Sequence, residues 1–276
     1  MNRIIDIHTH AFPDKIAKNT IEYLQGEADV KAALDGTLNS LLGSMEKAGI
    51  GISVLCSVAT KVSQFDSILK WSKEAASEKI ISFPSVHPDD PELLRKVDII
   101  YNKGFKGIKL HPYYQNFAIN EKRLFPFYKR IEEYGLIIMF HTGFDIAFEK
   151  YRIADPEKII DLKEHFPDLK FIASHIGAWE DWDEVKKYII GKDIYIDLAY
   201  SLNNPALTNA KELLLSHPKE YILFGSDSPW ASQSKTIELV KKLGLGEEIE
   251  NHIFYKNAER LLKINIAPSN SSIIPR

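Results

Sequence analysis

Cysteine is almost absent from this chain of 276 residues, in which Cys56 is the single example. One thiol forms no intrachain disulfide and provides no thiolate cluster for a structural zinc site. Any bound metal must therefore be held by nitrogen and oxygen atoms. The sequence also lacks a Gly-x-Gly-x-x-Gly or Gly-Lys-Ser/Thr pattern. That absence argues against a dinucleotide-binding or P-loop enzyme.

The sequence also lacks clusters of charges of one sign and long apolar runs. The 35 basic and 38 acidic residues are interspersed and give a formal net charge of -3, with no basic stripe that would attract nucleic acid or anionic lipid. No apolar run approaches the roughly 20 residues that span a bilayer, and the N-terminus has no signal-peptide pattern. We therefore expect a cytoplasmic protein that binds neither nucleic acid nor membrane.

The chain does contain a regular alternation of short apolar runs and helical stretches. The candidate strands are residues 4–7, 52–58, 80–86, 107–110, 136–140, 171–174, 194–198 and 221–225. They are nearly continuously apolar, which is typical of parallel strands covered on both faces. Stretches with helical apolar spacing lie between them, such as residues 38–48, which end at Gly49. The alternation predicts an α/β protein with a single (β/α)8 TIM barrel over residues 1–264, and an open doubly wound sheet is the alternative.

Two segments lie outside this alternation. Residues 11 to about 36 are longer than most strand-to-helix connections, so they either fold over the barrel mouth or form an ordinary surface insertion. Residues 265–276 carry Pro, Ser and Asn without a helical or strand period. We expect them to form a mobile tail.

Histidines are concentrated at the ends of the predicted strands. At or just after the C-terminal ends lie His8, His10, His87, His111, His141 and His175. In a TIM barrel these ends converge on the face that carries the active site. The other histidines, His165, His217 and His252, lie on predicted helices or their ends, and we expect them at the surface without a functional role.

The first and last strands carry the clearest candidate metal ligands. In the motif Asp-Ile-His-Thr-His at residues 6–10, the strand period places His8 and His10 on the same side, close enough to chelate one ion. Exposed turn residues are the alternative. Asp227 ends the eighth strand, where a carboxylate beside His8 and His10 would ligate a metal and accept a proton from water. A helix N-cap or Asx-turn before Pro229 is the other interpretation of Asp227.

The fifth and sixth strands end in a similar way. His141 follows the apolar run 136–140, and Gly143 permits a sharp exit from the strand; His175 follows the next run. A lone histidine at such a position is more often a hydrogen-bonded core residue. Beside His8 and His10, metal ligation by His141 is favoured.

These motifs, taken in order, resemble those of the amidohydrolase superfamily. The segments Ser-His-Ile-Gly and Phe-Gly-Ser-Asp-Ser-Pro are most similar to its branch containing aminocarboxymuconate semialdehyde decarboxylase and many uncharacterised hydrolases. The resemblance covers nearly the whole chain. It implies a metal, usually zinc, bound by His8, His10, His141 and Asp227. It also implies that His175 polarises the substrate or water, or binds a second metal.

The fourth strand leaves the number of metals open. Lys109 and His111 are two residues apart and face the same way. A carboxylated lysine on this strand bridges two ions in some members of the superfamily, whereas decarboxylase-like members generally lack it. Lys109 is therefore such a bridge, a cation for a substrate carboxylate, or a buried amine paired with an acid. We favour one divalent ion, Zn2+, with Mn2+ and Fe2+ as alternatives.

Several further residues are predicted to contact the substrate. His111 is one, and His87 is a candidate at the rim. Arg152, in the loop after the fifth strand, pairs with a substrate carboxylate or is a solvated charge. Tyr113 and Trp179 belong to a group of aromatic residues in the loops of this face, which would line a site for an apolar or aromatic substrate.

The combination predicts a metal-dependent hydrolase acting on an ester, lactone or amide of a small organic molecule, with Asp227 and His175 as catalytic residues. The alternative is a metal-dependent, non-oxidative decarboxylase of an unsaturated or aromatic carboxylic acid, because both reactions use this ligand set. A non-catalytic binding or scaffold protein is a third candidate, and the complete ligand set argues against it. A homodimer is expected only because symmetric dimers are common.

Overall fold

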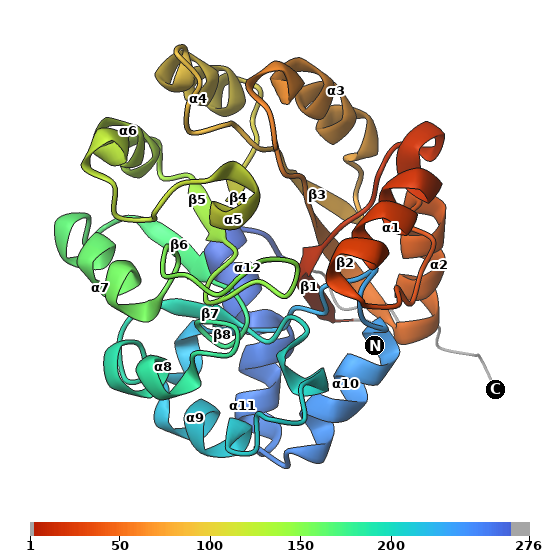
Figure 1. Ribbon diagram of the computed structural model, residues 1–276. Coiled ribbons are helices and arrows are strands. Elements are labelled where there is room, and N and C mark those ends of the chain that lie inside the picture. The colour runs from red at the N-terminus through yellow and green to blue at the C-terminus, as the bar shows by residue number, and fades with distance from the viewer. Residues whose placement is uncertain (1–2, 266–276) are drawn as a thin grey trace.

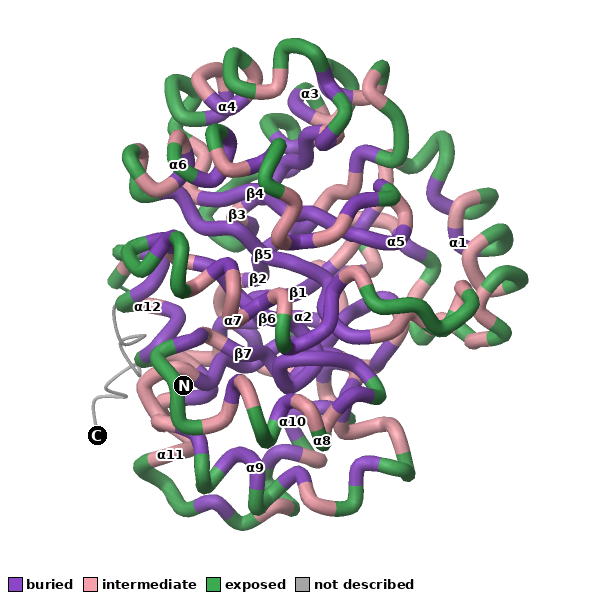
Figure 2. The backbone as a smooth tube through the Cα atoms, turned by 60° about the vertical axis from the view of Figure 1, so that its left-hand side comes forward, coloured by how far each residue is buried: buried purple, intermediate pink, exposed green. Residues whose placement is uncertain are grey.

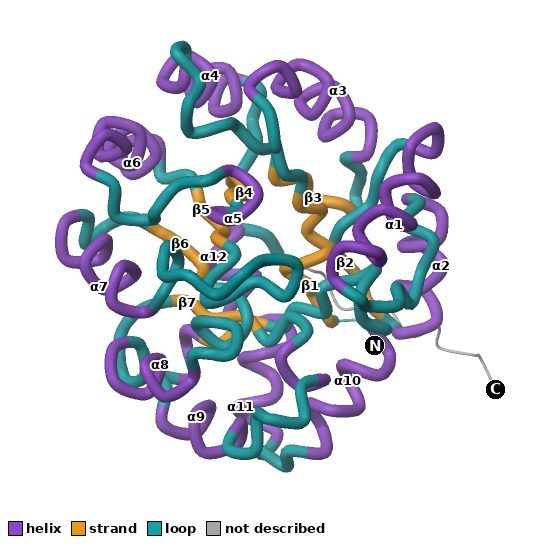
Figure 3. Tube along the Cα trace, in the orientation of Figure 1, coloured by secondary structure: helices purple, strands orange, loops and turns teal. Residues whose placement is uncertain are grey.

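The computed structural model describes residues 3–265 as a ring of parallel strands surrounded by helices (Figure 1). The strands are β1 (Ile4–Thr9), β2 (Ile50–Cys56), β3 (Ile80–Phe83), β4 (Gly107–Leu110), β5 (Ile137–Phe140), β6 (Lys170–Ala173), β7 (Tyr195–Asp197) and β8 (Ile222–Leu223). The α-helices are α1 (Asp14–Ala28), α2 (Leu38–Ala48), α3 (Phe65–Ala75), α4 (Leu93–Asn102), α5 (Pro112–Gln115), α6 (Phe125–Tyr134), α7 (Pro156–His165), α8 (Trp182–Tyr188), α9 (Ala210–Ser216), α10 (Gln233–Lys242), α11 (Glu247–Asn251) and α12 (Asn257–Leu262). Figure 3 shows the strands at the centre and most helices in an outer ring.

Hydrogen bonds close the ring at the two places where regular pairing stops. The strands pair in chain order as β1-β2-β3 and β4-β5-β6-β7-β8. Between β3 and β4, the backbone N–H of Lys109 donates to the carbonyl of Pro84 (2.9 Å). Between the β8 segment and β1, the N–H of Ile7 donates to Phe224 (2.9 Å). The chain therefore forms the predicted (β/α)8 barrel, and the open doubly wound alternative is wrong.

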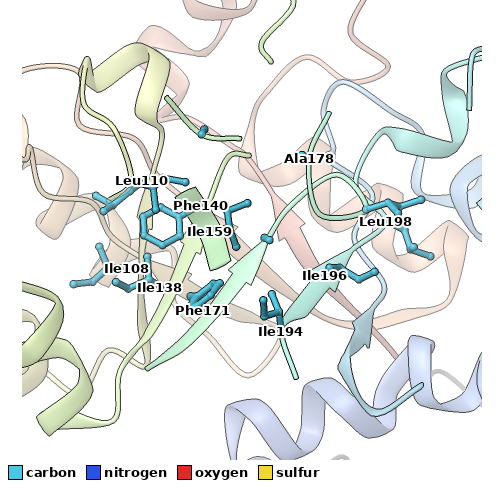
Figure 4. Close-up of a cluster of buried hydrophobic side chains, with 14 of the residues drawn as sticks. Ile108, Leu110, Ile138, Phe140, Ile159, Phe171, Ala178, Ile194, Ile196 and Leu198 are labelled. Atoms are coloured by element: carbon cyan, nitrogen blue, oxygen red, sulfur yellow. The ribbon is translucent and has the colours of Figure 1, made fainter. Parts of the chain in front are cut away.

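Apolar side chains pack on both faces of the strands. On β5, Ile138 and Phe140 belong to the larger cluster, which lies between the strands and the outer helices (Figure 4). Ile137 and Met139 belong to a second cluster inside the ring. Because strand side chains alternate between faces, His141 continues the inner series of Ile137 and Met139 beyond the end of β5. The packing of an ordinary strand thus delivers this imidazole to the barrel mouth.

Helix α12 covers the opposite end of the barrel. Its residues Ala258, Leu261 and Leu262 join the inner cluster, and Figure 1 shows the helix behind the ring of strands. Figure 2 shows buried residues concentrated at the centre and exposed residues mainly on the outer helices and loops. Water is thereby excluded from that end, which leaves the C-terminal ends of the strands as the accessible side.

Local signals predicted several element boundaries. Helix α2 spans the predicted residues 38–48; the Thr37 side chain accepts a hydrogen bond from Ser40 N–H at its start, and Gly49 ends it with φ +70°. Strand β4 also has the predicted bounds, whereas β8 has two residues instead of the predicted 221–225. Short barrel strands are held by neighbouring strands, so sequence pattern defines their ends poorly.

The segment after β1 contains helix α1 and returns beside its starting point. Phe12 pairs with Thr37, and Ala33 N–H donates to the Pro229 carbonyl in the loop after β8 (2.7 Å). Among the described residues, no helix is long and apolar enough to cross a membrane. The predicted tail, apart from Asn265, lies outside the described residues.

The prediction that His217 lies at the surface was wrong. This side chain is 4% exposed, and its Nε2–H donates to the Ile194 carbonyl (2.9 Å). Burial lowers its pKa to about 4. His217 is therefore a neutral core histidine that is hydrogen-bonded to a backbone carbonyl and is separate in sequence from the histidines at the strand ends.

Candidate metal centre

Three of the predicted ligands meet at the mouth of the barrel. Nε2 of His8 lies 3.6 Å and Nε2 of His10 lies 3.4 Å from Oδ1 of Asp227. Each separation exceeds an ordinary hydrogen bond. Two ligand atoms bound tetrahedrally to one ion at about 2.0–2.1 Å are about 3.3–3.4 Å apart. The spacing of His8, His10 and Asp227 therefore matches the edges of a metal coordination shell.

Backbone pairing between β1 and the β8 loop holds this group together. The N–H of Asp227 donates to the His8 carbonyl (2.9 Å), and the N–H of His10 donates to Ser228 (2.6 Å). Asp227 has φ +64°, a left-handed conformation that costs energy for a residue with a Cβ. The same turn directs its carboxylate at both imidazoles, so Asp227 is placed by the strand ends and is no helix N-cap.

The buried carboxylate of Asp6 also holds β1 to the loop after β8. It accepts hydrogen bonds from Ser226 N–H (2.9 Å), Ser226 Oγ (2.5 Å) and Gln233 Nε2 (2.8 Å). Burial raises the pKa of Asp6 to about 6, although these hydrogen bonds act in the opposite direction. Asp6 thus ties β1 to the segment that carries Asp227.

The outer nitrogens of the two candidate ligand histidines, His8 and His10, have fixed partners. Nδ1–H of His8 donates to Oδ2 of Asp197 (2.9 Å), and Nδ1–H of His10 donates to the Cys56 carbonyl (2.9 Å). A neutral imidazole that donates from Nδ1 carries its lone pair on Nε2. Both lone pairs therefore face Asp227, and carboxylate–histidine pairs such as Asp197–His8 are typical of metal sites.

The charge states suit a cation. Burial lowers the pKa of His8, whose location beside Lys109 acts in the same direction. Burial alone would raise the pKa of Asp227, but His8, His10 and His175 outweigh it and hold that pKa well below its usual range. The group thus provides a neutral His8 and an ionised carboxylate, while His10 and Asp227 remain partly exposed, with side chains 14% and 12% accessible.

His175 lies beside this group at the end of β6. Its ring centroid is 5.5 Å from that of His8, and its Nδ1–H donates to the Ala199 carbonyl (2.9 Å). Both His175 (φ +62°) and the β-branched Ile176 (φ +52°) adopt left-handed conformations, which are strained. Burial lowers the pKa of His175 to about 4. A neutral His175 therefore presents a lone pair on Nε2.

His141, the fourth predicted ligand, contacts His175 and belongs to a different cluster. Its Nδ1 lies 3.0 Å from Nε2 of His175. The structure groups it with His111 and Asp145, and neither His141 nor His175 belongs to the group of His8, His10 and Asp227. Its role as a ligand of the first group stays a prediction, which would require the ring to approach that group.

Lys109 reaches the centre from β4. The residue is 1% exposed, and its Nζ lies 3.1 Å from Nε2 of His8. Burial lowers its pKa, whereas Cys56, Asp197 and Asp227 raise it. An ammonium here competes with a metal for the His8 lone pair, and a carboxylated or neutral lysine does not. The three predicted roles of Lys109 thus depend on its chemical state.

The predicted substrate contacts are distributed unevenly. His111 stacks on His141 with ring centroids 4.1 Å apart, and Trp179 lies 6.1 Å from the His175 ring. Tyr113 is buried and donates from its hydroxyl to the Tyr151 carbonyl (2.5 Å). Arg152 is engaged elsewhere: its guanidinium lies 3.1 Å from Asp181 and 3.7 Å from Asp155.

Sequence reasoning missed Asp197 and Asp145. Asp197 ends the apolar run of β7, and a carboxylate at a barrel strand end is the signal that would have identified it. Asp145 follows His141 by four residues, and the loop geometry places it there. Gly143 has φ +85°, and a Cβ at this position would lie 2.0 Å from the Trp179 nitrogen. Only glycine allows the turn that returns Asp145 to His141.

Comparison with known proteins agrees with this architecture. A profile of the amidohydrolase family matches residues 5–264, so the chain belongs to that family. No curated protein matches the chain.

Solved structures share the fold at low identity. An uncharacterised TIM-barrel protein from Bordetella bronchiseptica is 20% identical with a TM-score of 0.75, over 94% of this chain and 98% of that one. A 5-carboxyvanillate decarboxylase from Novosphingobium aromaticivorans, with bound manganese and a nitrobenzoic acid, is 12% identical (TM-score 0.69; 95% and 97% covered). A protein described as a 2-pyrone-4,6-dicarboxylic acid hydrolase from Pseudomonas putida is 16% identical (TM-score 0.66; 97% and 100% covered). Proteins with this fold thus include both reaction classes.

Proposed function

We propose that the protein is a metal-dependent hydrolase that cleaves an ester, lactone or amide bond in a small organic molecule. The observation that carries this proposal is the group of His8, His10 and Asp227. The Nε2 atoms of His8 and His10 lie 3.6 Å and 3.4 Å from Oδ1 of Asp227, and outer hydrogen bonds aim both imidazole lone pairs inward.

The donor set fits a zinc-type ion. Two imidazole nitrogens and one carboxylate oxygen are ligands that zinc accepts, and three protein ligands leave an open position, as in catalytic zinc sites. Manganese and iron(II) accept the same donors. When bound, such an ion supplies Lewis acidity and lowers the pKa of bound water toward about 7. One ion at this group is sufficient for the proposed reaction.

The protein side chains then have separate tasks. Asp227, held ionised, accepts the proton of the attacking water and passes it to the oxygen or nitrogen of the leaving group. Neutral His175 offers a lone pair on Nε2, which suits a proton acceptor or a ligand. To stabilise negative charge on a substrate oxygen, His175 would have to be an imidazolium. The lowered pKa of His175 disfavours that form at neutral pH. Asp197 acts through His8 as a positioning residue.

The substrate is proposed to be a carboxylated or aromatic compound. Lys109, with its Nζ 3.1 Å from His8 Nε2, would provide a cation for a carboxylate when it is protonated. Aromatic side chains contact the histidines of the site: Tyr114 lies 4.8 Å from His111 and Trp179 lies 6.1 Å from His175, measured between ring centroids. The related solved structures, which include a decarboxylase of an aromatic acid and a pyrone dicarboxylate hydrolase, are compatible with this class.

Non-oxidative decarboxylation is the second candidate. It is favoured by the decarboxylases among proteins of the same fold and by the buried Lys109 beside the centre. Fold alone does not decide between the reactions. In the decarboxylase, the centre would bind the substrate, and no water would be consumed.

The test begins with elemental analysis of purified protein, with the His8→Ala, His10→Ala double variant as the control. Close to one zinc or manganese ion per chain in the wild-type protein, and none in the double variant, supports the centre. Background metal in both proteins after reconstitution contradicts it. The metal-loaded enzyme is then screened with esters, lactones and aromatic carboxylic acids in 18O-labelled water. Label in the acid product identifies hydrolysis; released carbon dioxide without water uptake identifies the decarboxylase.

A further inference from the structure

Tyr200 follows β7 and lies between two segments that carry the metal centre. Its backbone N–H donates to the Ser226 carbonyl in a long hydrogen bond (3.4 Å), and Ser226 directly precedes Asp227. On the other side, the carbonyl of the preceding residue, Ala199, accepts the Nδ1–H of His175 (2.9 Å). The position of Tyr200 is thus fixed relative to both the β6 end and the β8 end of the centre.

The backbone of Tyr200 is strained. Its φ is +57° and its ψ is -23°. A positive φ is an outlier for a bulky residue, and this ψ also lies outside the usual left-handed range of about +30° to +60°. Strain of this kind concentrates at functional sites, where the surrounding structure holds a side chain in one direction. The direction of the Tyr200 side chain is therefore the feature that needs an explanation.

The phenol ring of Tyr200 packs against an aromatic wall beside the centre. Its centroid lies 5.4 Å from that of Trp179, whose ring lies 6.1 Å from His175. Trp179 is 6% exposed, so this wall is fixed. Burial raises the pKa of Tyr200, and the nearby carboxylate of Asp227 acts in the same direction. A tyrosine hydroxyl already keeps its proton at neutral pH, so Tyr200 offers an O–H donor close to Asp227.

That hydroxyl has no protein partner. Within residues 3–265, the Tyr200 hydroxyl makes no hydrogen bond. Tyr200 is only partly buried, and its hydroxyl oxygen reaches solvent. The hydroxyls of Tyr113 and Tyr128, in contrast, donate to backbone carbonyls (2.5 Å and 2.7 Å), as buried tyrosines usually do. The Tyr200 donor is therefore available to a ligand in the barrel mouth.

Backbone donors at the same strand ends are already engaged. The N–H groups of His175 and Ala199 both donate to Oδ1 of Asp197 (2.9 Å and 3.1 Å). The N–H of Asp227 donates to the His8 carbonyl (2.9 Å). A substrate oxygen that gains negative charge during a reaction is stabilised by a hydrogen-bond donor aimed at it. These three N–H groups are not free to provide that hydrogen bond, whereas the Tyr200 hydroxyl is.

We propose that Tyr200 is a catalytic residue whose hydroxyl donates a hydrogen bond to the substrate oxygen at the reacting carbon. The inference rests on the proposed function, in which that oxygen belongs to the carbonyl of an ester, lactone or amide. The hydroxyl keeps its proton, so no bond to Tyr200 forms or breaks. The hydrogen bond strengthens as water adds to the carbonyl and charge develops on the oxygen, so it stabilises the transition state more than the substrate.

The first experiment measures the binding of phenylphosphonate, a tetrahedral oxyanion, to the zinc-loaded protein by isothermal titration calorimetry. Tyr200→Phe removes only the hydroxyl and should raise the Kd about 10–100-fold, as expected for a hydrogen bond to a charged group. Tyr195→Phe is the matched control, because it removes a hydroxyl from the opposite end of the same strand, where Arg260 contacts it (3.2 Å). Its Kd should equal that of wild type. Elemental analysis should show equal zinc contents in all three proteins.

The second experiment measures the hydrolysis of phenyl acetate and of the aromatic lactone dihydrocoumarin. Tyr200→Phe should lower kcat about 100–1000-fold with little change in KM, a split that a purely structural role would not produce. Tyr195→Phe should retain the wild-type kcat.

The two experiments distinguish failure of this inference from failure of the proposed function. Weaker phosphonate binding by Tyr200→Phe, at equal zinc content, supports the donor even if wild-type protein hydrolyses neither compound; that result would count against the hydrolase alone. Equal Kd values for wild type and Tyr200→Phe, or equal kcat values in a wild-type protein that hydrolyses the compounds, overturn the donor and leave the hydrolase standing. Absence of phosphonate binding by zinc-loaded wild type, or an equal loss of binding in Tyr195→Phe, also overturns it.

Discussion

Replacing Asp197 by asparagine should weaken metal binding without removing any predicted ligand. Oδ2 of Asp197 accepts a hydrogen bond from Nδ1–H of His8 (2.9 Å). Oδ1 accepts hydrogen bonds from the backbone N–H groups of His175 (2.9 Å) and Ala199 (3.1 Å). In Asp197→Asn, the amide oxygen must take the Oδ1 position, because only an acceptor satisfies both N–H groups. The amide NH2 then faces His8.

That arrangement reverses the tautomer of His8. An N–H group facing Nδ1 requires a lone pair there, so the proton of a neutral His8 moves to Nε2, where it blocks metal coordination. Losing an outer partner of a metal-binding histidine typically weakens affinity about 10–100-fold, which is about 1.4–2.8 kcal/mol. We expect the zinc Kd of Asp197→Asn to rise by this factor.

The assay is a competition titration against a chromophoric zinc chelator. Asp193→Asn is the control, because it makes the same change at an exposed carboxylate just before β7; its Kd should equal that of wild type. Thermal unfolding of the metal-free proteins separates a binding defect from a folding defect. A Kd for Asp197→Asn within about twofold of wild type, in a folded protein, would refute the tautomer argument.

Three further predictions test other parts of the structure. Asp227→Asn should abolish turnover in a substrate assay while the protein still binds metal above background, because His8 and His10 remain; near-normal activity would exclude Asp227 as the proton acceptor. Burial lowers the His217 pKa from 6.5 to about 4, so the unfolded chain gains a proton there below pH 6.5 and the folded protein does not. Urea unfolding should therefore show wild type losing about 2 kcal/mol more stability than His217→Gln between pH 7 and pH 5, and equal losses would contradict this. Gly143→Ala should reduce the unfolding free energy by about 2–3 kcal/mol, because the added Cβ meets the backbone of Trp179. Gly104→Ala, also at positive φ but with no atom near the added Cβ, should reduce it by about 1 kcal/mol in the same assay. Equal reductions would contradict the steric explanation.

The sequence predicted the barrel because periodicity and packing agree. Nearly continuous apolar runs, such as Ile137–Phe140, are required when both faces of a strand are buried. The position of His8, His10 and Asp227 could be inferred because strand ends in a barrel converge and because β8 pairs with β1. These features depend on chain order and on the strand period, both of which can be read from the sequence.

Features that depend on loop conformation could not be predicted. Asp145 approaches His111 only through the left-handed turn at Gly143, and the strained backbone of His175 and Ile176 directs the β6 end. His217 was misplaced because a histidine after a helix has no periodic signal of its burial. The pairing of Arg152 with Asp181 likewise depends on how two loops meet.

The most direct test of the metal centre is anomalous X-ray diffraction from crystals grown with saturating zinc or manganese. The account predicts an anomalous peak between the Nε2 atoms of His8 and His10 and the carboxylate of Asp227, at about 2.0–2.2 Å from each for zinc. It also predicts that Asp197 remains hydrogen-bonded to His8. A well-ordered barrel mouth without a peak at His8, His10 and Asp227 would contradict the central claim.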